Sequence, residues 1–89
     1  MTTYTQKLVF QNVEVITHFK ELDVKIIRFR WNNTVYNVTK TPNRWKIKDG
    51  EDSKTHFSVI CEKDGIIAEL CYHHKDFRWE LIQYENLET

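Results

Sequence analysis

Residues 57–81, FSVICEKDGIIAELCYHHKDFRWEL, decide the fold. On both sides of Asp64-Gly65, apolar or aromatic residues alternate with polar ones, as they do in a strand with one buried face. Asp-Gly favours a two-residue turn because both positions tolerate positive φ, so we expect Lys63 to pair with Ile66. The loop 73–76 then leads into another alternating run. The segment therefore predicts a three-stranded antiparallel meander.

Counting outward from the two turns places apolar side chains opposite one another on a single face of the meander. A slip of one residue would turn all of them to the other face, so we expect this face to form the core. Its expected members are Phe57, Val59, Cys61, Ala68, Leu70, Tyr72, Phe77, Trp79 and Leu81. The expected cross-strand pairs are 61 with 68, 59 with 70, 57 with 72, 70 with 79, and 68 with 81.

A second hairpin is predicted around Asn32-Asn33, because Asn tolerates the left-handed conformation of a tight turn. It pairs Phe29 with Tyr36 and residue 27 with residue 38. Val24 and residue 26 fall on the other parity, so a bulge near 26–27 or a sharp bend is needed if all these side chains point inward.

Two more strands come from the remaining alternating segments. Residues 13–19 form one, and residues 8–10 extend it. Residues 44–48 form a short one, in which we expect Trp45 and Ile47 to point inward. Any helix is limited to a turn near 18–23.

The composition predicts the same fold class. β-branched and aromatic residues are abundant, whereas Ala and Leu, which favour helices, are rare. We expect an all-β protein: a single small curved antiparallel sheet or open barrel of six to seven strands, with a C-terminal three-stranded meander. With 89 residues it forms a single domain, over 8–85, between flexible termini at 1–7 and 86–89.

Charge and apolar patterning exclude several classes of function. Thirteen Lys and Arg balance thirteen Asp and Glu, so no overall field attracts nucleic acid or an anionic membrane. No apolar run reaches the length of a signal peptide or a membrane span, which predicts a cytoplasmic protein without a membrane partner. Cys61 and Cys71 are expected on opposite faces of adjacent strands, as two reduced structural thiols.

A local basic surface is nevertheless possible, because each Trp follows an Arg, and neighbours in a strand point to opposite faces. If the strands that carry these cations are adjacent, five of them gather into one surface that could hold phosphates. The alternative is that they keep the sheet soluble and protect its edges. The candidate basic binding surface consists of Arg28, Arg30, Arg44, Lys46 and Lys48.

The sequence gives little support for a catalytic site or a metal site. There is no glycine-rich phosphate loop and no Ser or Cys placed beside a base by a known motif. Glu69 and Glu80 are expected to face each other across the last hairpin, on an exposed sheet face that water reaches. A zinc site needs four ligands, and Cys71, His73 and His74 fall short unless His56 or a carboxylate joins them. We therefore expect no catalytic residues, no metal and no cofactor.

The chain resembles a family of small bacterial β-barrel-like proteins of unknown function, over about residues 13–84. The shared pattern is R-F-x-W, a tight turn, Y-x-V, a connecting R-W, an aromatic-led strand and a closing W-x-L. It is carried here by Arg28, Phe29, Trp31, Tyr36, Val38, Arg44, Trp45, Phe57, Trp79 and Leu81. Members are often encoded near translesion DNA polymerase genes, so the resemblance implies a role in DNA damage tolerance.

Two functions are compatible with the sequence. The first is a non-catalytic binding module for a protein partner or a second copy of the chain, which would use an exposed edge or the strand at 8–19. The second is a nucleic-acid-binding accessory module that would use the basic surface.

Overall fold

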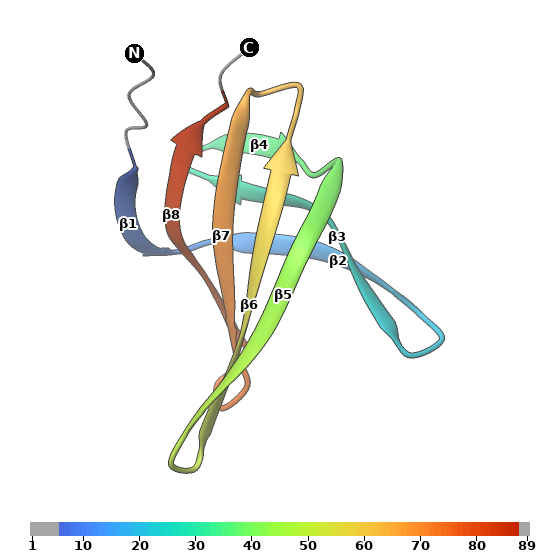
Figure 1. Ribbon diagram of the computed structural model, residues 1–89, viewed down its shortest axis with the longest axis vertical. Helices are drawn as coiled ribbons and strands as arrows, with labels where there is room; N and C mark the ends of the chain where they lie inside the picture. The colour runs from blue at the N-terminus through green and yellow to red at the C-terminus, as the bar shows by residue number, and fades with distance from the viewer. Residues whose placement is uncertain (1–5, 88–89) are drawn as a thin grey trace.

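The computed structural model describes residues 6–87, and these form two antiparallel sheets without a helix (Figure 1). The five-stranded sheet has the order β1-β8-β7-β6-β5, and the three-stranded sheet has the order β2-β3-β4. The all-β prediction is confirmed, with eight strands in two sheets in place of six or seven in one. The strands are β1 (Lys7–Asn12), β2 (Glu14–Lys20), β3 (Asp23–Trp31), β4 (Thr34–Asn37), β5 (Lys40–Asp49), β6 (Asp52–Cys61), β7 (Ile66–His73) and β8 (Arg78–Asn86).

The chain passes between the sheets at two corners, so that the three-stranded sheet crosses behind the five-stranded one (Figure 1). At the first corner Val13 lies between β1 and β2, and its N–H donates to the Trp79 carbonyl at 3.1 Å. At the second, the N–H of Thr39 donates to the Ile60 carbonyl at 2.8 Å. Residues 8–10 therefore do not extend the strand at 13–19. They belong to β1, which pairs with β8 in the other sheet.

The core fills the space between the inner faces of the two sheets. Val59, Cys61 and Leu70 of the meander are fully buried, and they belong to one cluster with Ile26 and Phe29 of β3. The predicted inner face of the meander is confirmed for eight of its nine members, of which Tyr72 and Trp79 are partly buried at its margin. Phe77 is wrong. It has a φ of 54° in the β7–β8 turn, and its side chain is exposed.

The predicted registers of the meander are wrong by two residues, except beyond the register shift between Glu69 and Leu70, where Ala68 pairs with Tyr84, three residues from its predicted partner. Cys61 pairs with Ile66, Val59 with Ala68 and Phe57 with Leu70, because residues 62–65 form a four-residue turn. In that turn the N–H of Gly65, at a φ of 66°, donates to the Glu62 carbonyl at 3.1 Å. In the next hairpin Leu70 pairs with Leu81 and Tyr72 with Trp79. A shift of two residues keeps each side chain on its face, so the core prediction survives.

The three-stranded sheet agrees closely with the prediction from the sequence. Phe29 pairs with Tyr36 as predicted, their rings stack at 5.1 Å, and both turn residues at 32–33 have positive φ. The predicted bulge is confirmed, since Ile16 pairs with Arg28 but the next residue of β2 pairs with Ile26. Residue 27 is therefore the extra one. No helical turn forms near 18–23, where Lys20 pairs with Asp23 across a two-residue hairpin turn.

Strand β5 departs furthest from expectation. It is ten residues long, and every residue in it is exposed, so Trp45 and Ile47 do not enter the core. Its register shifts between Lys40 and Asn43, at a bulge that contains Pro42, which has no N–H for the ladder. Beyond the bulge Trp45 pairs with His56 on the outer face.

The ends of the domain extend slightly beyond the predicted 8–85. Lys7 and Asn86 lie in strands, and the N–H of Leu87 donates to the Gly65 carbonyl at 2.8 Å. The rest of the predicted flexible termini, residues 1–5 and 88–89, lies outside the described residues. Within 6–87 the fold contains no helix long and apolar enough to cross a membrane.

Candidate binding cleft

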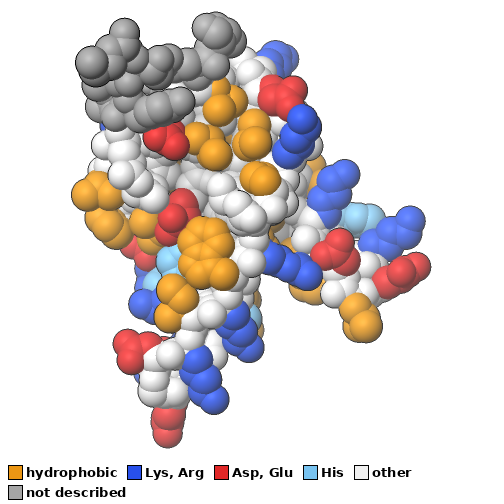
Figure 2. Space-filling view, in the orientation of Figure 1, with side chains coloured by type: hydrophobic (Ala, Val, Ile, Leu, Met, Phe, Trp, Pro, Cys, Tyr) orange, Lys and Arg blue, Asp and Glu red, His pale blue; other side chains and the backbone are white. Residues whose placement is uncertain are grey.

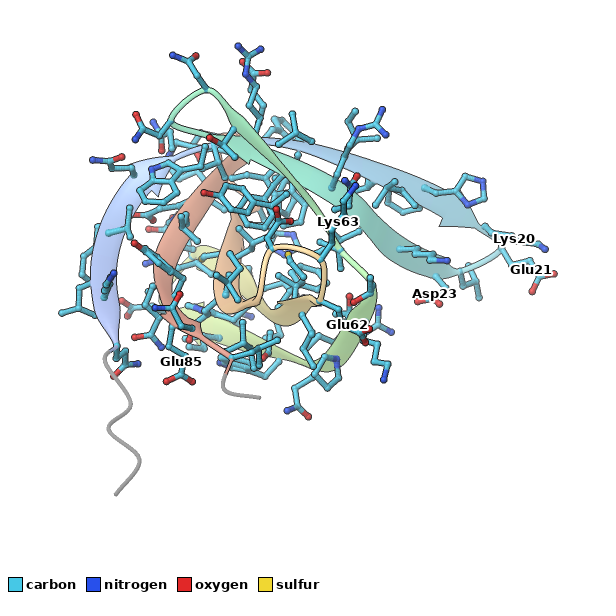
Figure 3. All side chains as sticks on the ribbon, turned by 90° about the horizontal axis from the view of Figure 1, so that it is seen from above. Lys20, Glu21, Asp23, Glu62, Lys63 and Glu85 are labelled. Carbon is cyan, nitrogen blue, oxygen red and sulfur yellow. The ribbon has the colours of Figure 1, made fainter. Side chains whose placement is uncertain are left out.

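A cleft of about 550 Å³ opens where the two sheets separate beyond the core. The β2–β3 hairpin forms one wall and the β5–β6 hairpin forms the other, because both hairpins project from the body of the protein (Figure 1). Figure 3 shows Lys20, Glu21 and Asp23 at the tip of the first hairpin, well away from the sheets' common interior. The aromatic residues that line the cleft are Phe19, Phe57, Tyr72, His74 and Trp79, together with the strand position of Trp45, whose ring lies on the outer face.

The floor of the cleft is a set of packed rings from the five-stranded sheet. The Trp79 ring lies 5.4 Å from Phe57 and 4.9 Å from Tyr72, between centroids. The Tyr72 ring meets His74 edge-on at 5.1 Å, and His74 Nε2 lies 2.7 Å from the Thr55 hydroxyl. Rings held in this way lose little side-chain entropy when a ligand covers them.

Phe19 supplies the apolar wall opposite this floor. The alternation of β2 places Thr17 and Phe19 on the inner face, where they pair with residues 26 and 24 of β3. The core ends before it reaches Phe19, so 71% of this residue is exposed, although Val15 and Thr17 on the same face are partly buried. Burying a side chain of this size on a ligand stabilises the complex by roughly 1.5–3 kcal/mol.

Cations stand on the β5 side of the cleft. Arg44 is held by an ion pair with Asp23, whose Oδ1 lies 3.2 Å from Nη1 and which belongs to the other sheet. Lys46 also lines the cleft and has no ion-pair partner within residues 6–87. The cleft thus offers an apolar surface with one free positive charge at its rim.

The five residues of the predicted basic surface do not lie together. Arg28 and Arg30 alternate with the buried Phe29, so they are on the outer face of the three-stranded sheet. On β5, the other three residues follow the parity of Arg44, which pairs with the inward Phe57. One continuous basic surface required β3 and β5 to be adjacent strands. They belong to different sheets, so this requirement is not met.

The outer face of the five-stranded sheet carries a hydrogen-bonded chain that the sequence did not reveal. His56 Nδ1 lies 2.9 Å from a Glu69 carboxylate oxygen, and its Nε2 lies 3.7 Å from Cys71 Sγ. Because a carboxylate accepts, Nδ1 carries the proton and Nε2 can accept from the thiol. The Gln83 amide donates to the other Glu69 oxygen at 3.1 Å, and the Trp45 ring stacks on His56 at 5.3 Å.

This thiol, imidazole and carboxylate stand in the order of a catalytic triad, but the thiol is unsuited to attack. Cys71 is only 1% exposed. Burial, and then the negative charge of Glu80, raises the pKa of the Cys71 thiol, so it stays protonated at neutral pH. The predicted Glu69–Glu80 pairing is wrong, since Glu80 pairs with Cys71 across the strands and approaches His73 at 2.8 Å.

We expect Cys71 to react with iodoacetamide at least about tenfold more slowly in the native protein than in urea, because reaction requires opening of the sheet. The rate is measured at pH 7.5 by mass spectrometry of the peptide that contains Cys71, with Cys61→Ala to isolate this thiol. Equal rates with and without urea would instead identify an accessible nucleophile.

The residues considered as metal ligands lie apart in the structure. His56 and Cys71 lie on the outer face, His73 is bound to Glu80, and His74 turns to Thr55 at the cleft. Within the described residues 6–87, no three His, Cys, Asp or Glu side chains converge in a way that could hold a metal ion. Both cysteines are free, buried and on opposite faces, as predicted from the sequence.

Comparisons with protein-family models, curated proteins and solved structures found no match to this chain.

Proposed function

We propose that the protein is a non-catalytic interaction module that binds a segment of a partner protein in the cleft between its two sheets. The observation that supports it most is the exposed Phe19 opposite a packed aromatic floor, in a cleft of about 550 Å³. A cleft with apolar walls and a few polar groups at its rim is typical of a ligand site.

Nucleic acid is the second candidate, and the resemblance to proteins encoded near translesion polymerase genes leads to it. Aromatic rings beside Lys46 could stack bases and neutralise a phosphate. Two carboxylates of the β2–β3 hairpin disfavour this function. Asp23 neutralises Arg44, and Glu21 lies at the tip of the hairpin. The cleft favours a protein segment, which needs apolar burial more than a series of phosphate contacts.

Photo-cross-linking from the cleft separates these candidates. With benzoylphenylalanine in place of Phe19, we expect a discrete adduct in the cells that express the protein, and we expect nuclease to leave its mass unchanged. The matched control is the same substitution at Phe10, which is also exposed but lies on β1, outside the cleft. An adduct that nuclease destroys would establish the second candidate. Equal adducts from both positions, or none, would contradict the proposal.

A further inference from the structure

Strand β5 ends the five-stranded sheet and has a free edge. It pairs only with β6, and within residues 6–87 no backbone hydrogen bond joins residues 41–49 to the three-stranded sheet. All ten of its residues are exposed. A long edge with unpaired N–H and C=O groups is a template to which another extended segment can add as a strand.

The side chains of β5 give this edge two distinct faces. Beyond the bulge, Arg44, Lys46 and Lys48 all lie on the inner side, beside the cleft. Trp45 and Ile47 lie between them on the outer side, and both are about half exposed. Figure 2 shows Lys and Arg side chains spaced along the course of β5 down to the tip of its hairpin.

This pattern disfavours a second copy of the chain as the added strand. When a strand pairs antiparallel with itself, residues opposite one another share a face. The register that aligns 43–49 with itself therefore sets Arg44 against Lys48 and Lys46 against itself, and a shift of two residues sets Arg44 against Lys46. Like charges directly opposite destabilise a sheet, and Lys46 and Lys48 have no acidic partner within residues 6–87.

We infer that β5 accepts an extended segment of a partner protein in which acidic and apolar residues alternate. The acidic side chains lie opposite Lys46 and Lys48 on the cleft side, and the apolar ones lie beside Trp45 and Ile47. The backbone of the segment pairs with the free edge, and charge complementarity sets its register. This inference rests on the proposed function, since it names the chemistry of the protein segment that reaches the cleft.

A synthetic probe tests the inference without the partner itself. The probe is a fluorescein-labelled peptide of alternating Glu and Val that spans the length of Asn43–Asp49, and its binding is measured by fluorescence anisotropy. We expect saturable binding to the wild type, weakened at least about tenfold by Lys46→Glu with Lys48→Glu, because like charges then face each other. The matched control, Lys7→Glu with Lys63→Glu, makes the same charge change on β1 at the opposite edge of the sheet and in the β6–β7 turn, and should leave affinity within about twofold.

Three other probes separate strand addition from simple charge attraction. We expect no binding by a peptide with Lys in place of Glu. We expect a large loss with Glu and Val in separate blocks, or with methyl groups on the amide nitrogens of one edge, which remove backbone donors but no charge. Equal binding of the block or methylated peptide would overturn the inference, as would tighter binding of a labelled oligothymidylate that Lys46→Glu abolishes. If these probes fail but the cross-link from Phe19 remains, the inference is wrong and the proposed function stands.

Discussion

Replacing Leu70 by alanine is expected to lower the free energy of unfolding by about 3 kcal/mol. Leu70 is 0% exposed and lies in β7, at the centre of the five-stranded sheet, where it pairs with Phe57 and Leu81. Strands on both sides prevent the sheet from closing over the cavity that the substitution leaves. A domain of this size has a total stability of about 5 kcal/mol, so the variant keeps only a small margin.

Urea denaturation followed by tryptophan fluorescence and circular dichroism measures this effect. Leu22→Ala removes the same atoms from a residue that is 101% exposed in the β2–β3 turn, and we expect it to change stability by less than about 0.5 kcal/mol. A loss below about 1 kcal/mol for Leu70→Ala, or equal losses for the two variants, would show that β7 is not the centre of the core.

The sequence predicted faces better than registers, for a physical reason. Side chains in a strand alternate, so the pattern around Val59 and Leu70 specifies which of them share a face. The Asp-Gly pair shows where the chain turns but leaves the number of turn residues open between two and four. In the structure Gly65 ends a four-residue turn, and the resulting shift by two residues exchanges partners without exchanging faces.

The cleft could not be predicted because it depends on where the sheets stop covering each other. Phe19 continues the inward alternation of β2, and nothing in the sequence shows that the core ends before it. Trp45 was expected inside because it is large and apolar. Its actual face is set by the bulge at Pro42 and by the absence of a second layer over that part of β5. The proline was the available signal, since proline in a strand indicates an edge or a bulge.

The chain from Cys71 through His56 to Glu69 needed the correct register. With a two-residue turn, position 56 would lie opposite position 73, whereas the four-residue turn sets His56 opposite Cys71. A long-range contact of this kind connects residues 15 apart, and each residue of turn length moves it along the strand. Local pattern therefore determined that Cys71 lies on the outer face but not what it touches.

The protein is expected to lose about 2 kcal/mol of stability between pH 7.5 and pH 10.5 through Cys61 alone. Burial in the core, and then the negative charge of Asp64, raises the pKa of the Cys61 thiol from 9.0 to about 11. The folded state therefore holds this proton more tightly than the unfolded state does. The stabilisation is fully present below pH 9 and is lost as the pH rises toward 11, at about 1.4 kcal/mol per pH unit.

Cys61→Ala isolates this effect, because lysine and tyrosine side chains titrate in both proteins over the same range. Urea denaturation at pH 7.5 and pH 10.5 gives the alkaline loss for each protein, and we expect the loss in the variant to be smaller by about 2 kcal/mol. The cost of the substitution itself cancels, since each protein is compared with itself. Cys71, whose pKa is also raised by burial, contributes a loss of the same sign in both proteins. An identical alkaline loss in the two proteins would mean that the Cys61 thiol titrates as it does in water, and that the space between the sheets is not dry at this position.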